Sequence, residues 1–418
     1  MTTMKKRFAA GLVLLALTGA ACGTDDDGDA AGAAGGVGAG DDASSSTTDH
    51  SSMKEAGGAG YEKAYAEVRT AYHHMWETGG VLSGAIAKQN NFADTGENKA
   101  AATNVALSSL LGEHVLLATV ATTKGLAGAP DFDAAAGALD ANSVQLADTV
   151  GSVYGEEAKN EFLKQWRDHI RMFVDYTKAT AAKDKAGQDK AVAELGGYVK
   201  NFGSFLAKAV GLPEAAVQAS VNDHVGQLKG ALDAAAAGNY DEAYAKVREG
   251  YHHMVETGGV LAGAIAKQKN LGDPASKQAQ TTIALGSLLG EHAAIAAVTT
   301  TKGLDGAPDF EAIAGALDKN SLELAETIGS VYGEPAKNEF LKQWRDHIRM
   351  FVDYTKATAA DDKPGQEKAV QELGGYVNNF GSFLAKAVGL PEAAVQASVK
   401  DHVFQLKGAL DAYAAAKG

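Results

Sequence analysis

The chain has 418 residues, of which 45% are hydrophobic, and a formal net charge of −14 at neutral pH. This acidic balance argues against nucleic-acid binding, which needs a basic surface to displace counterions from phosphates. A single cysteine excludes an intramolecular disulfide, and beyond the N-terminus no apolar run approaches the roughly 18 residues of a membrane-spanning helix.

Residues 1–22 have the pattern of an export signal. Three basic residues at 5–7 precede an apolar stretch over 8–17, and small residues then lead to Cys22. The segment resembles the signal of bacterial lipoproteins, in which the cysteine becomes the lipid-modified first residue. The resemblance implies a protein anchored to the outer face of the cell membrane through a lipid on Cys22. Ordinary cleavage after Ala21, which would give a secreted protein, stays open.

Residues 23–60 consist mainly of Gly, Ala, Asp, Ser and Thr, with almost no apolar side chains. Such a segment cannot bury enough surface to offset the entropy that it would lose on ordering. We therefore predict a disordered acidic tether between the membrane and a folded body. His50 lies in this tether, where we expect a solvated side chain without a function.

From Tyr61 onward the sequence predicts helices almost everywhere. Ala, Leu, Lys, Glu and Gln dominate, and the period-two alternation of half-buried strands is absent. Pro130 precedes Asp131, which is a candidate helix N-cap. Long helices with short connections pack as antiparallel neighbours, so we predict an all-α protein built of helical bundles. The helices expected in the first part are about 61–88, 98–124, 131–152, 155–182, 186–210 and 213–236.

The helical region is a tandem repeat with a period of about 178 residues. Residues 201–221 and 379–399, for example, are identical. A repeated sequence unit supplies one structural unit per copy, so we predict two homologous bundles of about six helices each, over 61–237 and 238–418. Whether each bundle closes on its own first helix or the two repeats exchange first helices stays open.

Ten of the 11 histidines occupy matching positions in the two repeats. Imidazole is the commonest metal ligand in proteins. Several of these histidines lie within the apolar stripe of a predicted helix, near its middle. Antiparallel helices of similar length bring their midpoints level, so we expect four rings per repeat to form one layer if their helices are neighbours. The candidate ligands are His74, His114, His169 and His224, with their counterparts His253, His292, His347 and His402.

Four neutral imidazoles buried together would leave donors and acceptors unpaired, at about 1–3 kcal/mol for each such group. A metal ion would satisfy a nitrogen of every ring at once, so we favour one metal site per bundle. A core layer in which each histidine bonds to a carbonyl, tyrosine or acid is the alternative. Further candidates, as ligands or as groups that support them, are His73, His252, Glu113, Asp168, Asp223, Glu291, Asp346, Asp401, Met75, Met172, Met254 and Met350.

The residues beside the histidines favour copper. Met75 follows His74 directly, and Met172 lies one turn after His169. A thioether near imidazoles suits copper, although methionine more often fills gaps in a core. Iron, zinc and haem stay open as alternatives.

Several segments together resemble the tandem helical units of exported bacterial proteins that are sometimes labelled copper amine oxidase-like. These segments include LLGEH at 110–114, WRDHIRMFVDYTKAT at 166–180 and DHVGQLKGALDA at 223–234. The resemblance covers nearly all of the helical region and implies a helical fold without assigning a function to any residue. Asn239-Tyr240-Asp241 also resembles the tripeptide from which copper amine oxidases form a quinone cofactor. That family has a β-sandwich catalytic domain, which this sequence does not predict, so we interpret Asn239 as a helix cap.

The sequence thus predicts an exported, lipid-anchored protein that binds a transition metal in each bundle, for storage, buffering or delivery. Motifs of nucleophilic hydrolases and nucleotide-binding enzymes are absent, so binding is favoured over catalysis, and catalysis stays open. One alternative is a surface spacer or interaction module whose histidines only pack. Another is a redox protein with two metal ions or a haem. The sequence does not indicate a protein partner.

Overall fold

The computed structural model describes residues 50–90 and 99–418, with side chains from residue 58 onward. Within these residues the regular elements are all α-helices and no strand is present, as the sequence predicts. The predicted export signal with Cys22, and residues 23–49 of the predicted tether, lie outside the described residues. The helices are α1 (His50–Gln89), α2 (Lys99–Ala127), α3 (Phe132–Tyr154), α4 (Glu156–Ala181), α5 (Lys185–Val210), α6 (Glu214–Ala236), α7 (Tyr240–Lys269), α8 (Lys277–Asp305), α9 (Phe310–Tyr332), α10 (Glu334–Ala359), α11 (Lys363–Val388) and α12 (Glu392–Lys417).

The helix ends lie close to the predicted ones, with three corrections. α1 begins at His50, within the predicted tether, because the run 53–56 (Met-Lys-Glu-Ala) consists of good helix formers that the composition of the longer segment hides. The carboxylate of Asp131 does not cap α3; it accepts a hydrogen bond from Tyr65 and pairs with Lys124, both at 2.8 Å. Asn239 occupies the N-cap position of α7, but its side chain makes no capping hydrogen bond.

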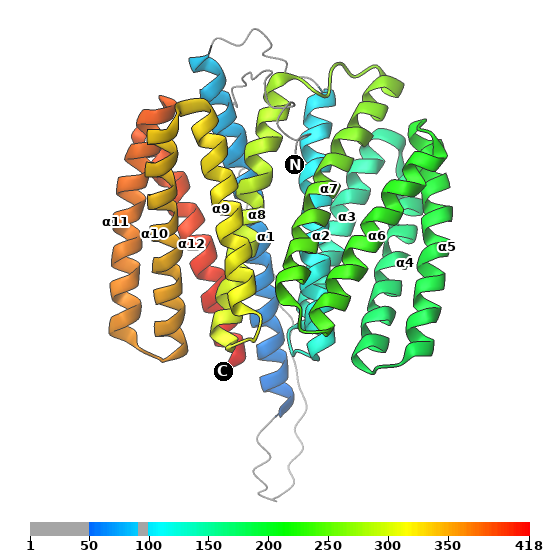
Figure 1. The fold of residues 1–418 in the computed structure, drawn as a ribbon, viewed down its shortest axis with the longest axis horizontal. Coiled ribbons are helices and arrows are strands. Elements are labelled where there is room, and N and C mark those ends of the chain that lie inside the picture. The colour runs from blue at the N-terminus through cyan, green and yellow to red at the C-terminus, as the bar shows by residue number, and fades with distance from the viewer. Residues whose placement is uncertain (1–49, 91–98) are drawn as a thin grey trace, which may run out of the picture.

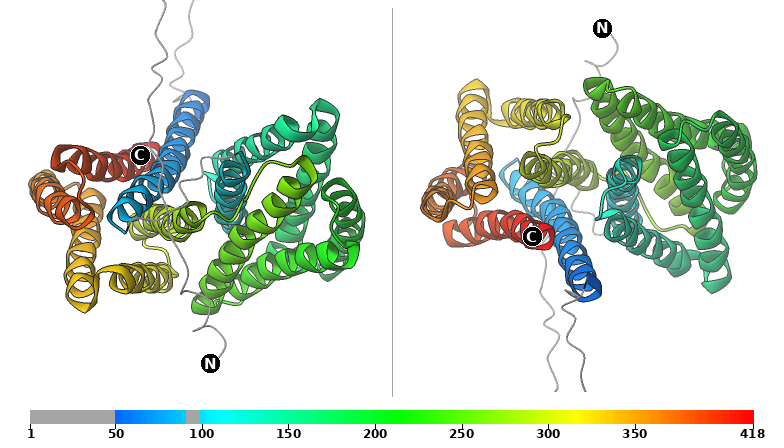
Figure 2. Two further views of the ribbon diagram at one scale, coloured as in Figure 1. Left: turned by 90° about the horizontal axis from the view of Figure 1, so that it is seen from above. Right: turned by 90° about the horizontal axis from the view of Figure 1, so that it is seen from below.

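The two repeats exchange their first helices (Figures 1 and 2). α1 packs along α8 and α12 of the second repeat, and α7 packs along α2 and α6 of the first repeat. We call α2–α6 with α7 the first bundle, and α8–α12 with α1 the second bundle. Each bundle is a ring of six helices in which consecutive neighbours pack together and one helix comes from the other repeat.

Two glycines allow the exchanged helices to approach their neighbours closely. A Cβ added at Gly79 of α1 would lie 2.6 Å from the backbone nitrogen of Gly286 in α8. A Cβ at the matching Gly258 of α7 would lie 2.5 Å from the backbone nitrogen of Ser108 in α2. Side chains do not fit at such distances, so both positions need glycine for this packing.

Alternate helices of each ring face its interior. In the first bundle α2, α4 and α6 contact one another across the ring, and α8, α10 and α12 do so in the second bundle. Among the described helices, α2 and α8 are long and apolar enough to cross a membrane, but most of each apolar stretch is buried against other helices. The bundles meet where α2 packs on α8, α1 on α3, and α7 on α9.

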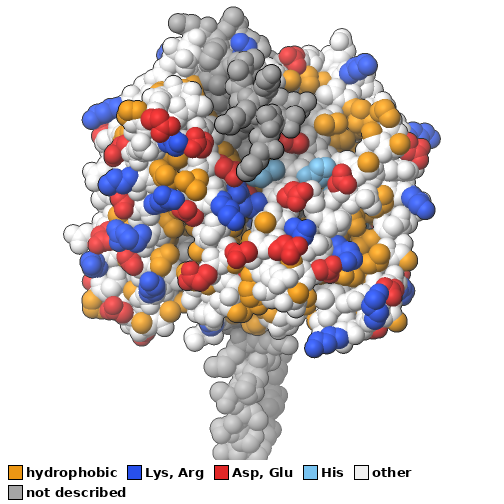
Figure 3. All heavy atoms as spheres, in the orientation of Figure 1, with side chains coloured by type: hydrophobic (Ala, Val, Ile, Leu, Met, Phe, Trp, Pro, Cys, Tyr) orange, Lys and Arg blue, Asp and Glu red, His pale blue; other side chains and the backbone are white. Residues whose placement is uncertain are grey.

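The outer surface carries charges of both signs. Basic and acidic side chains are interspersed over the face shown in Figure 3, without a continuous area of one sign. Many of them form ion pairs between neighbouring helices. Arg167 pairs with Asp140 and Arg345 with Asp318, at 2.6 Å and 2.7 Å. Exposed pairs of this kind contribute little to stability.

Candidate metal centres

Three histidines converge in the core of each bundle, one from each inward-facing helix. In the first bundle they are His114 on α2, His169 on α4 and His224 on α6, and one nitrogen of each ring lies within 4.8 Å of the others. All three are at most 4% exposed. We call this group the first triad. The second triad, in the second bundle, consists of His292, His347 and His402 and has the same arrangement.

Two of the three rings in each triad have the spacing of ligands around one metal ion, and the third lies within 4.8 Å of them. Nε2 of His114 lies 3.4 Å from Nε2 of His169, and the corresponding distance between His292 and His347 is 3.3 Å. Tetrahedral ligands at about 2.0–2.1 Å from a metal are separated from each other by about 3.3–3.4 Å. The same distance is long for an N–H···N hydrogen bond between two neutral rings.

Several ring nitrogens of the triads have no hydrogen-bond partner in the fold. Both nitrogens of His224 and Nδ1 of His114 are buried without a hydrogen-bond partner among the described residues. In the second triad, both nitrogens of His402 and Nδ1 of His292 are likewise buried without a partner among the described residues. Each unpaired buried group costs about 1–3 kcal/mol, so these nitrogens are costly to bury unless a ligand binds them. A metal ion would take up one lone pair from each ring.

Aromatic side chains surround the rings. The ring centre of Trp166 lies 4.7 Å from those of both His114 and His169, and Tyr198 stacks on His169 at 4.8 Å. Trp344 and Tyr376 take the same places in the second triad. These walls fix the imidazole orientations and keep water away from the nitrogens.

Burial keeps the triad histidines neutral. It lowers the pKa of His224 to about 3, with a further contribution from the nearby His253. Burial also lowers the pKa values of His114 and His169 well below the ordinary value, and the neighbouring rings add to this. Neutral rings keep the lone pairs that a metal ligand needs.

The exchange of first helices separates His74 from the histidines with which we grouped it. His74 lies on α1, so it belongs to the second bundle, where its Nε2 is 3.0 Å from the backbone oxygen of Ser398. In the first bundle the matching residue is His253, whose Nε2 is 3.1 Å from the oxygen of Ser220. The predicted layer therefore contains three rings from its own repeat. The fourth histidine comes from the other repeat and is hydrogen-bonded to a carbonyl beside the triad.

His73 points away from His74 and belongs to a different group of residues. Its Nε2 lies 3.2 Å from Oε1 of Glu113, which Arg69 also binds through two hydrogen bonds of 3.0 Å and 3.1 Å. Asn142 donates a fourth contact, of 2.8 Å. Burial raises the pKa of Glu113, but His73 and Arg69 outweigh it, so the pKa lies below its ordinary value. We call these residues the Glu113 network, and its carboxylate is fully engaged away from the triad.

The second repeat contains a similar arrangement, the Glu291 network. Arg248 binds the buried Glu291 at 2.9 Å and 3.0 Å and the exposed Glu323 at 3.0 Å and 3.1 Å. His252 lies 3.7 Å from Glu291 and 4.0 Å from Glu323. The histidine and the two carboxylates are close enough to hold a metal ion. Arg248 already binds both acids, and its single positive charge leaves them with one net negative charge. Sequence analysis missed the two arginines, although each stands four residues before its histidine, on the same helix face.

The remaining candidates lie outside the triads. Asp168 and Asp346 are about half exposed and lie 3.9 Å and 3.1 Å from neighbouring lysines, and Asp223 and Asp401 are exposed. Met172 and Met350 are partly buried at the edges of the cores. Met75 and Met254 are buried on the exchanged helices, and Met254 lines the same cavity as His224.

Comparison of the chain with protein families, curated proteins and solved structures finds no match. The functional argument therefore depends on the geometry of the two triads.

Proposed function

We propose that each bundle binds one transition-metal ion through its triad, and that the ion is copper(I). The observation that carries this proposal is the meeting of three neutral imidazoles in each core. Nε2 of His114 lies 3.4 Å from Nε2 of His169, the matching distance in the second bundle is 3.3 Å, and both nitrogens of His224 lack any partner among the described residues. A metal ion accounts for the close approach of these lone pairs and would bind one nitrogen of each ring.

The charge of the site favours copper(I) over divalent ions. Among the described residues neither triad includes a carboxylate, and Glu113, which precedes His114, is neutralised by Arg69. Burying an ion costs a free energy that rises steeply with its charge, so a monovalent ion is the least costly to hold here. Imidazole suits copper, and the thioether of Met254 lies in the same cavity wall as His224.

We further propose that the protein stores, buffers or delivers copper outside the cytoplasm. The export signal over 1–22 and the candidate lipid-modified Cys22 support a position at the outer face of the cell membrane. A deeply buried site of neutral ligands is suited to holding an ion, so binding is favoured over catalysis. The candidate partner is the membrane, reached through the lipid.

The strongest competing function is a helical spacer whose histidines only pack. It is favoured by one observation, since the 3.4 Å between His114 and His169 also permits a weak hydrogen bond between the rings. Haem receives less support, because the three rings of a triad converge from different directions and do not face each other across a plane.

Titration with copper(I) tests the proposal. The full chain, purified without chelator, is titrated anaerobically against a competing chelator, and bound metal is measured by mass spectrometry. We expect two ions per chain, and one ion in each of the single variants His224→Ala and His402→Ala. His252→Ala is the matched control: it should retain two ions, because His252 lies outside both triads. A chain that binds no metal, or variants that all retain two ions, would contradict the proposal.

A further inference from the structure

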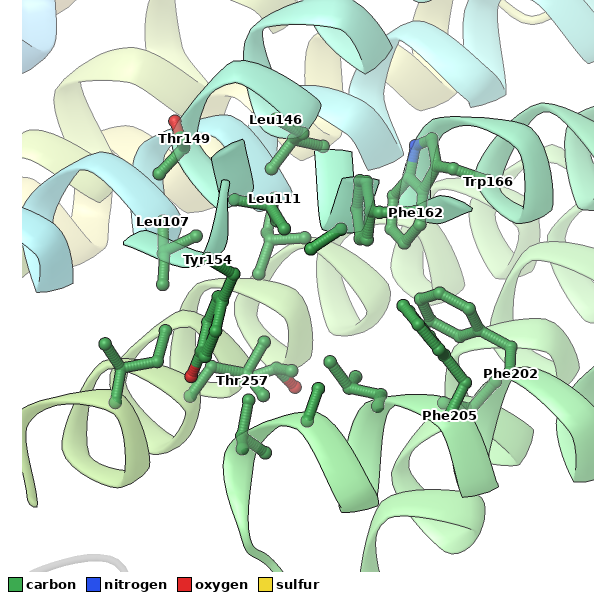
Figure 4. A pocket seen from close by; sticks show the side chains of 18 of the residues that line it. Leu107, Leu111, Leu146, Thr149, Tyr154, Phe162, Trp166, Phe202, Phe205 and Thr257 are labelled. Carbon is green, nitrogen blue, oxygen red and sulfur yellow. The ribbon is translucent and has the colours of Figure 1, made fainter. Parts of the chain in front are cut away.

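A cavity of about 130 Å³ lies beside the first triad, inside the first bundle. Its wall is almost entirely hydrocarbon and includes Leu107, Leu111, Phe162, Phe202 and Phe205 (Figure 4). These side chains come from α2, α4 and α5. His224 and Trp166 also line the cavity, so it borders the triad directly.

Three hydroxyl groups of the wall are occupied elsewhere. Thr149 donates to the oxygen of Gln145 at 3.0 Å, and Thr257 donates to the oxygen of His253 at 2.8 Å. Tyr154 donates to Gln268 at 2.7 Å, which ties α3 to the exchanged helix α7. None of these donors is directed to a guest in the cavity.

Two polar side chains of the wall do have free atoms. Both nitrogens of His224 and Nε1 of Trp166 are buried without a partner among the described residues. They lie toward the triad, because Trp166 packs on His114 and His169. The cavity thus has a hydrocarbon wall, and the rings of His224 and Trp166 separate it from the triad.

The size and polarity of the cavity together define the kind of molecule that it can bind. An apolar cavity of about 150 Å³ stays dry and binds benzene, since a water molecule needs two to four polar partners. Three protein ligands leave one position of a tetrahedral metal open. We propose that the cavity binds a small, neutral, mainly hydrocarbon molecule of about the size of a benzene ring. A guest with one lone pair reaches the open metal position, and this second part rests on the proposed metal function.

The α3 side of the cavity is less deeply buried than the α2 side. Thr149, Val150 and Tyr154 of α3 are partly buried, whereas Leu107 and Leu111 of α2 are buried. Lys269 of α7 lies over the Tyr154 ring at 4.6 Å. A guest therefore enters between α3 and α7, past a tyrosine held by the exchanged helix.

Two guests of equal shape test the proposal. Toluene has no lone pair, whereas 4-methylpyridine at pH 8 is neutral and offers one nitrogen. We expect toluene to shift the NMR signals of the Trp166 indole and the His224 ring saturably, to the same extent in metal-free and copper(I)-loaded protein. We expect 4-methylpyridine to bind the loaded protein at least about tenfold more tightly than the metal-free protein, a difference of about 1.4 kcal/mol.

Paired variants locate the guest. Val150→Phe should abolish the toluene shifts at Trp166 by filling the cavity. The matched variant Ile328→Phe, at the same place in the second repeat, should leave them unchanged. Val150→Ile introduces the residue that the second repeat has at this position, so it keeps the fold and should weaken binding by a smaller factor.

The outcomes separate this proposal from the metal proposal. If copper does not bind but toluene does, the metal function fails and the cavity stands. If copper binds and toluene shifts neither signal, the cavity proposal is overturned. Equal affinity of 4-methylpyridine for loaded and metal-free protein overturns contact between guest and metal.

Discussion

The triads and the Arg–Glu networks place histidine in two contrasting chemical settings. Members of both groups lie on adjacent faces of one helix, about 100° apart. Glu113 and His114 are neighbours in α2, yet the carboxylate faces Arg69 at the interface between bundles and the imidazole faces the core. In the network each charge has a partner. In the triad the groups are neutral and several nitrogens have no partner.

This difference shows how neighbours decide the use of a histidine. His73 and His74 are adjacent in α1, and the helix turns them toward different repeats. Charged partners make the network a structural element that fixes the exchanged helices. The lack of charged partners leaves the triad available for a cation.

The largest effect is expected from removing a buried carboxylate. Glu291→Ala should lower the free energy of unfolding by about 3–5 kcal/mol, because Arg248 would remain buried and lose its main partner. Glu323→Ala removes the exposed partner of the same arginine and should cost at most about 1 kcal/mol. Urea unfolding of both variants measures the difference, and equal losses would show that burial does not set the strength of this network.

The triads should make the metal-free protein sensitive to acid. Unfolded histidines titrate near pH 6.5, whereas burial lowers the pKa of His224 and of His347 to about 3. The stability is therefore fully present above pH 6.5 and falls as the pH decreases toward 3, since only the unfolded chain takes up protons. At pH 5.5 the three histidines of a triad would cost about 4 kcal/mol in each bundle. Thermal unfolding from pH 7.5 to 5 tests this, and a flat profile would contradict the burial of neutral rings.

Replacing a triad histidine by a residue of similar size should stabilise the metal-free protein and abolish metal binding in one bundle. In His224→Leu the two unpaired nitrogens disappear, so we expect the free energy of unfolding to rise by about 1–3 kcal/mol. The same variant should bind one copper(I) ion. A variant that is less stable than the parent chain without metal would show that His224 makes stabilising contacts as a packed residue.

The smallest effect is expected where the two networks differ in sequence. Gln145 stands in the Glu113 network where Glu323 stands in the Glu291 network. Gln145→Glu should stabilise the chain by no more than about 1 kcal/mol, because an exposed ion pair gains little. The gain in stability from Gln145→Glu should disappear in high salt, because salt screens exposed ion pairs. A larger gain, or one that does not depend on salt, would mean that position 145 is more buried than an exposed ion pair would be.

The all-helical fold and the inward direction of three histidines per repeat could be predicted from local sequence. His114, His169 and His224 each lie in the apolar stripe of a long helix, and that stripe must face a core. The exchange of α1 and α7 could not be predicted. The repeats are so similar that each first helix finds nearly the same surface on either partner, and only the spatial path of the chain decides between them.

The partners of the acidic residues could not be predicted from the local sequence either. Glu113 follows the pattern of an acid beside a metal ligand, but its partners Arg69 and Asn142 come from other helices. Asp131 has the sequence position of an N-cap, and Lys124 and Tyr65 take its carboxylate instead. In each case a tertiary contact outweighs the local signal.

X-ray absorption spectroscopy of the copper(I)-loaded chain tests the central claim most directly. We predict three imidazole nitrogens at about 2.0 Å from each copper ion. At equal protein concentration, His224→Ala should give a copper absorption edge of half the height, with the same nitrogen shell around the remaining ion. A first coordination shell made of carboxylate oxygens, or an edge height unchanged by that substitution, would contradict the assignment of the triads as the metal sites.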